Sequence, residues 1–193
     1  MNQVHPSKYY PDRKNIRLKD FCYATHGSYF VTIVTQNRKL LFGYIKDGEN
    51  ILNEAGQMVT NVYEEMNQTY PLAYFLNAVV MPNHFHCLIC LQEDDAISLS
   101  RIIQHFKSET TWRYSLGVKE KGWPRYEGKL WQGRFYDHIV RSQPAYDMIN
   151  QYIYNNPMRW DKDKLNPSCI NDADDINAMI KQYETSPIII SSP

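Results

Sequence analysis

The sequence predicts an α+β fold, a ferredoxin-like sandwich whose antiparallel sheet carries helices on one face, with an added C-terminal helix. Two observations predict it. Segments with strand and helix periodicity follow one another in the order β, α, β, β, α, β, α. Two of the apolar runs are joined through Met81-Pro82-Asn83, a turn sequence that favours an antiparallel hairpin. Helices gathered on one side of such a sheet leave its second face accessible.

The first half of the pattern predicts one strand, one helix and the hairpin. Residues 29–35 are rich in β-branched and aromatic residues, as strands are. Residues 53–68 have apolar positions at helical spacing, with Asn53 as a cap and Pro71 beyond the end. The hairpin strands are residues 74–80 and 84–91.

The second half predicts two helices separated by a strand. In residues 98–114, apolar side chains repeat at intervals of three and four, and Ser98 is placed to cap the helix. Residues 130–140 form a strand with an interruption at Gly133. The last helix spans residues 145–156 and ends where a proline follows.

Composition divides the chain into three parts: a basic N-terminal arm (1–27), a central folded domain (28–160) and a loosely attached C-terminal tail (161–193). The tail's apolar residues 188–190 offer the alternative of an edge strand.

Net charge is zero, so global electrostatics neither demand nor exclude a polyanionic partner. No segment has the roughly 20 apolar residues of a membrane span, and four cysteines fit reduced thiols. We therefore expect a cytoplasmic protein without a membrane partner.

A basic run extends over residues 119–141, in the loop and the predicted strand before the last helix. It carries six cations among five aromatic rings, and the rings are Trp123, Tyr126, Trp131, Phe135 and Tyr136. Cations mixed with flat rings suit single-stranded nucleic acid, which needs charge for phosphates and platforms for unstacked bases. A solvated face over core aromatics is the alternative.

Two histidines stand two apart in the strand that follows the turn. His84 and His86 project from one face, while Phe85 enters the opposite, core side. Two imidazoles are thus preset for one metal ion. The alternative is an ordinary pair of solvent-facing or hydrogen-bonded histidines.

The last helix presents a phenol and an amide together. Tyr152 and Asn156 lie four residues apart, hence on one helical face, while Ile149 and Ile153 anchor an adjacent stripe to the sheet. Read alone, in a chain with 15 tyrosines, Tyr152 is typical of an ordinary amphipathic core tyrosine.

Four segments carry a resemblance to a known family. Residues 81–89, 103–108, 131–138 and 152–157 read MPNHFHCLI, IQHFKS, WQGRFYDH and YIYNNP. In order and spacing they resemble the REP-associated tyrosine transposases, single-tyrosine members of the HUH nuclease superfamily. The resemblance covers about residues 25–160 and implies nothing for the arm or for the tail beyond about residue 163.

The resemblance implies the chemistry. His84, His86 and Asn156 are expected to bind Mg²⁺ or Mn²⁺, and Tyr152 is expected to attack a phosphodiester and form a covalent 5′-phosphotyrosine. The implied function is that of a single-stranded DNA endonuclease and strand transferase acting at hairpin-bearing DNA. Apart from the resemblance, the polar residues that we expect to contact the DNA strand are Gln104, His105, Lys107, Arg134 and His138. The alternative for them is a polar helix face and an exposed strand edge, and His138 is also a candidate for orienting a site group.

Two other functions stay open at this stage. A domesticated protein that binds DNA hairpins without cutting them needs no tyrosine and no metal site. A replication initiator or relaxase of the same superfamily uses similar chemistry but normally has a larger scaffold. The sequence also leaves open whether two copies form a homodimer.

Overall fold

A four-stranded antiparallel sheet forms the centre of the fold. The computed structural model describes residues 27–92, 98–169 and 173–185; the expected N-terminal arm and residues 188–190 lie outside them. The strands are β1 (Ser28–Val34), β4 (Ala73–Met81), β5 (His84–Leu91) and β6 (Tyr136–Val140), in the order β4-β5-β1-β6. The predicted α+β class with an antiparallel sheet is confirmed.

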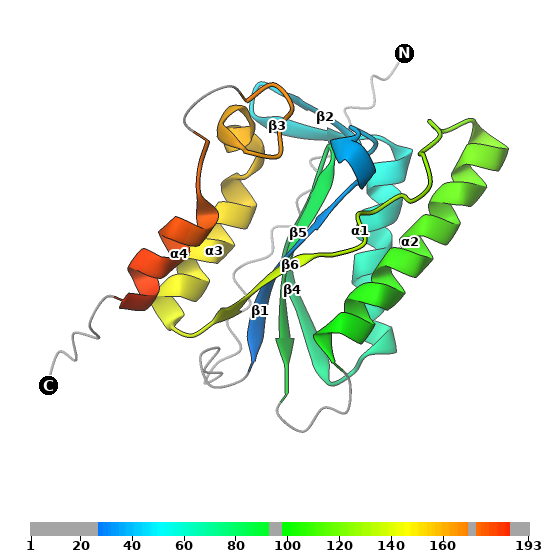
Figure 1. The fold of residues 1–193 in the computed structure, drawn as a ribbon. Coiled ribbons are helices and arrows are strands. Elements are labelled where there is room, and N and C mark those ends of the chain that lie inside the picture. The colour runs from blue at the N-terminus through cyan, green and yellow to red at the C-terminus, as the bar shows by residue number, and fades with distance from the viewer. Residues whose placement is uncertain (1–26, 93–97, 170–172, 186–193) are drawn as a thin grey trace, which may run out of the picture.

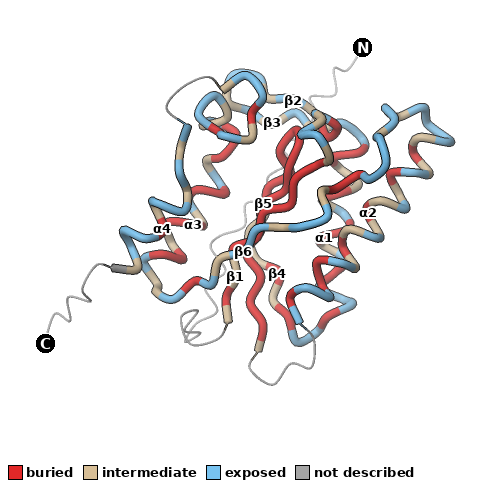
Figure 2. The backbone as a smooth tube through the Cα atoms, viewed as in Figure 1, coloured by how far each residue is buried: buried red, intermediate tan, exposed pale blue. Residues whose placement is uncertain are grey.

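The helices lie on both faces of the sheet. Helices α1 (Glu54–Thr69) and α2 (Leu99–Lys121) share one face, whereas α3 (Gln143–Asn155) and α4 (Ile176–Thr185) lie on the other (Figure 1). We expected the second face to be accessible, and this was wrong. Both faces of β5 are consequently buried along its whole length (Figure 2).

Two hydrophobic clusters hold these layers together. Alternate strand residues such as Phe85 point toward α1 and α2, and their neighbours such as Leu88 point toward α3 and α4. The predicted caps are present, because Asn53 Oδ1 accepts from Gly56 N and Ser98 Oγ from Arg101 N. The strand periodicity and cap residues therefore set the main layers.

Several elements depart from the predicted bounds. Helix α2 runs to Lys121 instead of residue 114, and β6 begins only at Tyr136. The strand predicted for residues 130–140 is interrupted because Lys107 Nζ donates to the carbonyl oxygens of Gln132 and Arg134, each at 2.9 Å, which diverts that backbone from the ladder. A hairpin of β2 (Gly43–Lys46) and β3 (Glu49–Leu52) was not predicted.

The segment after α3 packs against the domain instead of forming a loose tail. The short 3₁₀ helix η2 (Pro157–Lys162) continues directly from α3, and a second one, η1, spans Gln36–Arg38. Asp163 and Asn166 are buried, and Ile180 of α4 is fully buried in the cluster beside α3. The helical part of this segment therefore contributes to the core.

Phe106 tests the packing on the α1–α2 side. Its ring stacks on Phe85 with centroids 4.9 Å apart and is 2% exposed. We expect Phe106→Ala to lower the free energy of unfolding by about 3–5 kcal/mol through a cavity. Trp112→Ala, at an exposed site on the same helix, should change it by about 0.5 kcal/mol or less. Urea denaturation of both variants measures the difference, and equal effects would contradict the assignment.

Candidate metal centre and tyrosine site

The strand β5 places both histidine side chains on the face that α3 covers. Their ring centroids are 4.6 Å apart, and Phe85 between them enters the opposite core, as predicted. His84 is 0% exposed and His86 is 2% exposed. The alternation of the strand was read correctly, but the pair is buried instead of exposed.

Asn83 fixes the protonation of His84. The amide Nδ2 of Asn83 donates to the carbonyl oxygens of Arg38 and Leu165, so its Oδ1 is the free acceptor. That oxygen lies 2.8 Å from His84 Nδ1, which must therefore carry the hydrogen. The lone pair of His84 is then on Nε2, the form that binds a metal ion.

His86 is held in a similar way from the neighbouring strand. Thr32 is its partner in the β1–β5 register, and Thr32 Oγ1 lies 2.8 Å from His86 Nδ1. The interaction leaves His86 Nε2 as the remaining ring atom. Both imidazoles thus meet polar partners through Nδ1.

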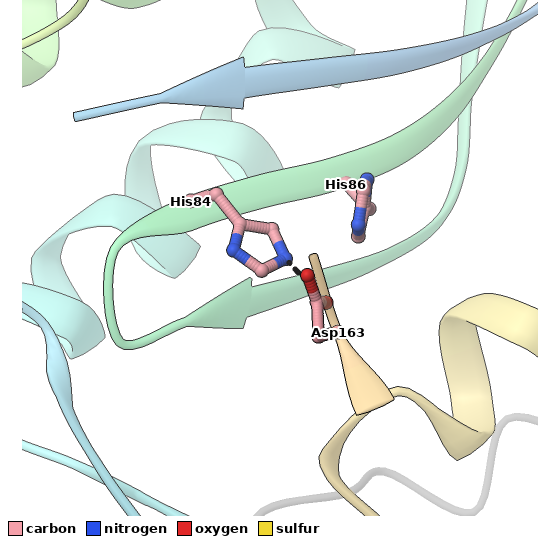
Figure 3. A group of neighbouring side chains, drawn as sticks. All are labelled: His84, His86 and Asp163. Atoms are coloured by element: carbon pink, nitrogen blue, oxygen red, sulfur yellow. Dashed lines mark ion pairs between the residues drawn. The ribbon is translucent and has the colours of Figure 1, made fainter. Parts of the chain in front are cut away.

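Asp163 joins the two histidines, and the sequence analysis missed it. Its Oδ2 lies 3.5 Å from His84 Nε2, and one ligand atom from each of the three residues falls within 4.8 Å of the others (Figure 3). Its Oδ1 accepts from Leu165 N at 2.7 Å and so holds the carboxylate in place. Asp163 stood in the segment taken for a tail, and no periodic pattern marked it.

Helix α3 brings Tyr152 and Asn156 to the same place. Ile149 and Ile153 are fully buried and fix the helix on the sheet. The Tyr152 ring lies edge-on to His86, with centroids 5.6 Å apart. Asn156 is buried at the end of the same helix, and its side chain contacts both His84 and Tyr152. The predicted convergence of strand and helix is present.

Four buried polar atoms of this cluster have no hydrogen-bond partner. They are His84 Nε2, His86 Nε2, Asn156 Oδ1 and Asp163 Oδ2. Leaving such an atom unsatisfied costs about 1–3 kcal/mol. Two nitrogen and two oxygen donors at one point fit a divalent cation, which satisfies all four at once.

The protonation states of the two histidines also suit binding of a divalent cation. Burial lowers the pKa of His84 to about 3, and burial followed by the nearby His84 lowers the pKa of His86. Both rings are therefore neutral and able to donate a lone pair. Burial, and next the charge of Asp163, raise the pKa of Tyr152, so without a cation its phenol keeps its proton.

The five residues predicted to contact the DNA strand lie outside this cluster. Gln104, His105 and Lys107 are on α2, across the sheet from the histidine pair. His105 Nδ1 is bonded to Tyr70 Oη at 2.9 Å, and His138 pairs with Glu184 of α4 at 3.0 Å. Arg134 is exposed in the loop before β6. Both histidines are thus engaged within the protein.

Fold and site together define an α+β domain in which a histidine pair on a strand, with a carboxylate that could complete a metal site, faces a tyrosine on a helix. Residues 23–156 match the family described as IS200-like transposases. The chain belongs to this family.

Two relatives and one solved structure are among the proteins to which this chain is similar. A Haemophilus influenzae protein described as uncharacterized is 32% identical, over 79% of this chain and 92% of its own. The REP-associated tyrosine transposase of Escherichia coli K12 is 28% identical, over 71% and 70% of the two chains. A REP-associated tyrosine transposase solved with a REP hairpin is 26% identical, covering 69% of this chain and 68% of its own, with a TM-score of 0.48.

Asp163→Asn tests the ligand group. The amide keeps an oxygen for Leu165 N but loses the negative charge, so Mn²⁺ affinity should fall at least tenfold. Isothermal titration with Mn²⁺ measures it. Asp161→Asn, an exposed carboxylate two residues earlier, is the matched control and should bind like the parent protein. Equal affinity of the Asp163 variant would remove this residue from the site.

Proposed function

We propose that this protein is a metal-dependent single-stranded DNA endonuclease and strand transferase that acts through a covalent 5′-phosphotyrosine. The observation that carries the proposal is the convergence of four unsatisfied donor atoms with the phenol of Tyr152. Two relatives are described as a REP-associated tyrosine transposase and a putative one, which supports transposase chemistry. Hairpin-bearing DNA is the substrate that the sequence resemblance implies. A ferredoxin-like arrangement of the sheet belongs to the same proposal.

His84, His86, Asn156 and Asp163 hold the ion in this scheme, and Mg²⁺ and Mn²⁺ are the candidates. The bound ion supplies Lewis-acid polarisation of the nonbridging phosphate oxygens. Burial, and next the charge of Asp163, raise the pKa of Tyr152, so a cation bound at Asp163 would offset the second of these causes. Binding of the cation and deprotonation of Tyr152 would thereby be coupled.

The reaction exchanges one phosphorus–oxygen bond for another. The phenol oxygen of Tyr152 bonds to phosphorus, the bond to the 3′ oxygen breaks, and the phenolic proton ends on the released 3′ oxygen. The bond energy is retained, so another 3′-hydroxyl can reverse the step and join a new strand. Tyr152 is only 7% exposed, so the residues packed around its ring must move before a phosphodiester can reach the phenol oxygen.

Tyr152→Phe tests the nucleophile. The variant lacks the attacking oxygen but keeps the ring that packs on Phe30 and His86, so it should form no covalent DNA adduct while binding hairpin DNA within about twofold of the parent. Denaturing electrophoresis with Mn²⁺ and labelled DNA measures the adduct. Tyr154→Phe, on the exposed side of the same helix, is the control and should react normally. An adduct that survives in the Tyr152 variant would refute the role.

His84→Ala tests the dependence on metal. Cleavage should be lost at saturating Mn²⁺, because one ring nitrogen of the ion's ligand set is gone. Strand cleavage is followed across a Mn²⁺ titration, beside the parent protein. Full activity of the variant would remove the metal-site proposal. Hairpin binding by the parent protein without any adduct would instead favour the non-cutting alternative.

A further inference from the structure

Strand β6 forms one edge of the central sheet. Among the strands that the structure describes, it pairs only with β1, which pairs on its other side with β5. The outer side of β6 therefore presents backbone groups that no described strand covers. Such an edge is a template to which another extended segment can add.

The hydrogen bonds of β1 show which groups of β6 point outward. A strand between two antiparallel neighbours bonds to them through alternate residues. Gly27 O, just before β1, accepts from Leu91 N at 3.1 Å, so the odd-numbered residues of β1 bond toward β5. The even-numbered residues bond toward the other side, where Val34 O accepts from Gln132 N at 2.9 Å.

Asp137 and Ile139 consequently direct their N–H and C=O groups to the open edge. The partners of the even-numbered β1 residues are residues 136, 138 and 140, so the two residues between them bond away from β1. Within the described chain, neither of the two N–H groups donates to a backbone group outside the sheet. Both side chains are exposed as well, that of Ile139 by 42%.

The opposite edge of the described sheet, β4, is protected. A bulge between Phe75 and Ala78 interrupts its register, and Asn50 Nδ2 of β3 donates to Val80 O at 2.6 Å. Bulges and covering groups both hinder the addition of a strand. The register of β6 is regular, so β6 is the edge of the two that a further strand can join.

The chain after α4 has the composition of such a strand. Residues 186–193 read SPIIISSP, with three consecutive β-branched isoleucines between two prolines. A proline cannot donate to a ladder, so Pro187 and Pro193 restrict pairing to the residues between them. The segment therefore suits a short edge strand.

Helix α4 ends where this segment can reach β6. Glu184 Oε1 lies 3.0 Å from His138 Nε2, and Ser142 Oγ donates to the carbonyl oxygen of Tyr183 at 3.3 Å. The end of α4 thus lies beside the C-terminal half of β6. Residues 186 and 187 span up to about 7 Å, and paired strands lie about 4.8 Å apart. Residues 188–190 can therefore run back along the open edge, antiparallel to β6.

Charge favours this segment over a second copy of β6. Two copies of β6 paired edge to edge would bring two Asp137 carboxylates close together on one face of the sheet, which is unfavourable. Residues 186–193 carry no charged side chain and bring no such repulsion. The exposed carboxylate thus disfavours a second molecule and accepts the chain's own segment.

We infer that residues 188–190 of this chain add to the open edge of β6 as a further strand, bonded to the N–H and C=O groups of Asp137 and Ile139. The added strand closes this edge to a second copy. It also ties the end of α4 to the sheet, on the face where α4 and α3 pack beside the histidine pair. Neither DNA nor metal takes part, so the inference is independent of the proposed function.

Hydrogen exchange of the full chain, followed by mass spectrometry, tests the pairing. The amides of Asp137 and Ile139 should be protected in the parent protein. Because alternate residues of a strand bond to the ladder, either Ile189→Pro or Ile190→Pro removes a bonded N–H, whichever register is adopted. That variant should speed exchange at residues 137 and 139 about tenfold or more.

Two controls accompany these variants. The amide of His138 points to β1 and should keep its exchange rate, which separates loss of the added strand from unfolding of β6. Ser192→Pro lies beyond the paired residues and should exchange like the parent. Rapid exchange at residues 137 and 139 in the parent, or parent-like protection in both isoleucine variants, would overturn the inference. Protection that is lost on dilution of the parent would assign the edge to a second copy and would overturn it too.

Discussion

The carboxamide of Asn83 is the contact on which the site depends. Its Nδ2 ties the loop at Arg38 to the segment at Leu165, and its Oδ1 sets the tautomer of His84. One side chain thus joins three distant parts of the chain and directs a lone pair toward Asp163. Because Asn83 is fully buried, losing any of these bonds would leave a polar atom without water. The turn between β4 and β5 is therefore both a connection and the support of the site.

Burial of the polar cluster costs free energy, and the packing around the cluster offsets this cost. Buried neutral imidazoles beside a buried carboxylate are unfavourable unless something compensates the charge and the missing hydrogen bonds. Apolar packing of α3 and α4 on the sheet holds these groups in place, since Ile149, Ile153 and Ile180 are fully buried next to them. The four unsatisfied donor atoms fit a divalent cation as this compensation. Hydrophobic packing thus maintains an arrangement that polar interactions alone would not favour.

Local rules predicted what depends on local geometry. Strand alternation placed His84 and His86 together, and Asn53 and Ser98 were recognised as caps because each needs only the next turn of helix. Asp163 was missed because nothing nearby in sequence marks a carboxylate that a helix and a 3₁₀ turn carry back to the sheet. The burial of the histidines was missed for the same reason, since it depends on α3 and α4 covering the second face. Such outcomes follow from packing between remote segments, which periodicity does not encode.

Two of the segments that carried the family resemblance meet through Lys107. The bonds from the ammonium on α2 to the carbonyls of residues 132–134 span 25 to 27 residues of sequence. Gln132 N in turn donates to Val34 O, and Val34 is the partner of His84 in the sheet. The loop of residues 132–134 is therefore attached to the end of β1 that lies beside His84. The basic segment and the histidine pair thus belong to one continuous structure, although they face opposite sides of the sheet.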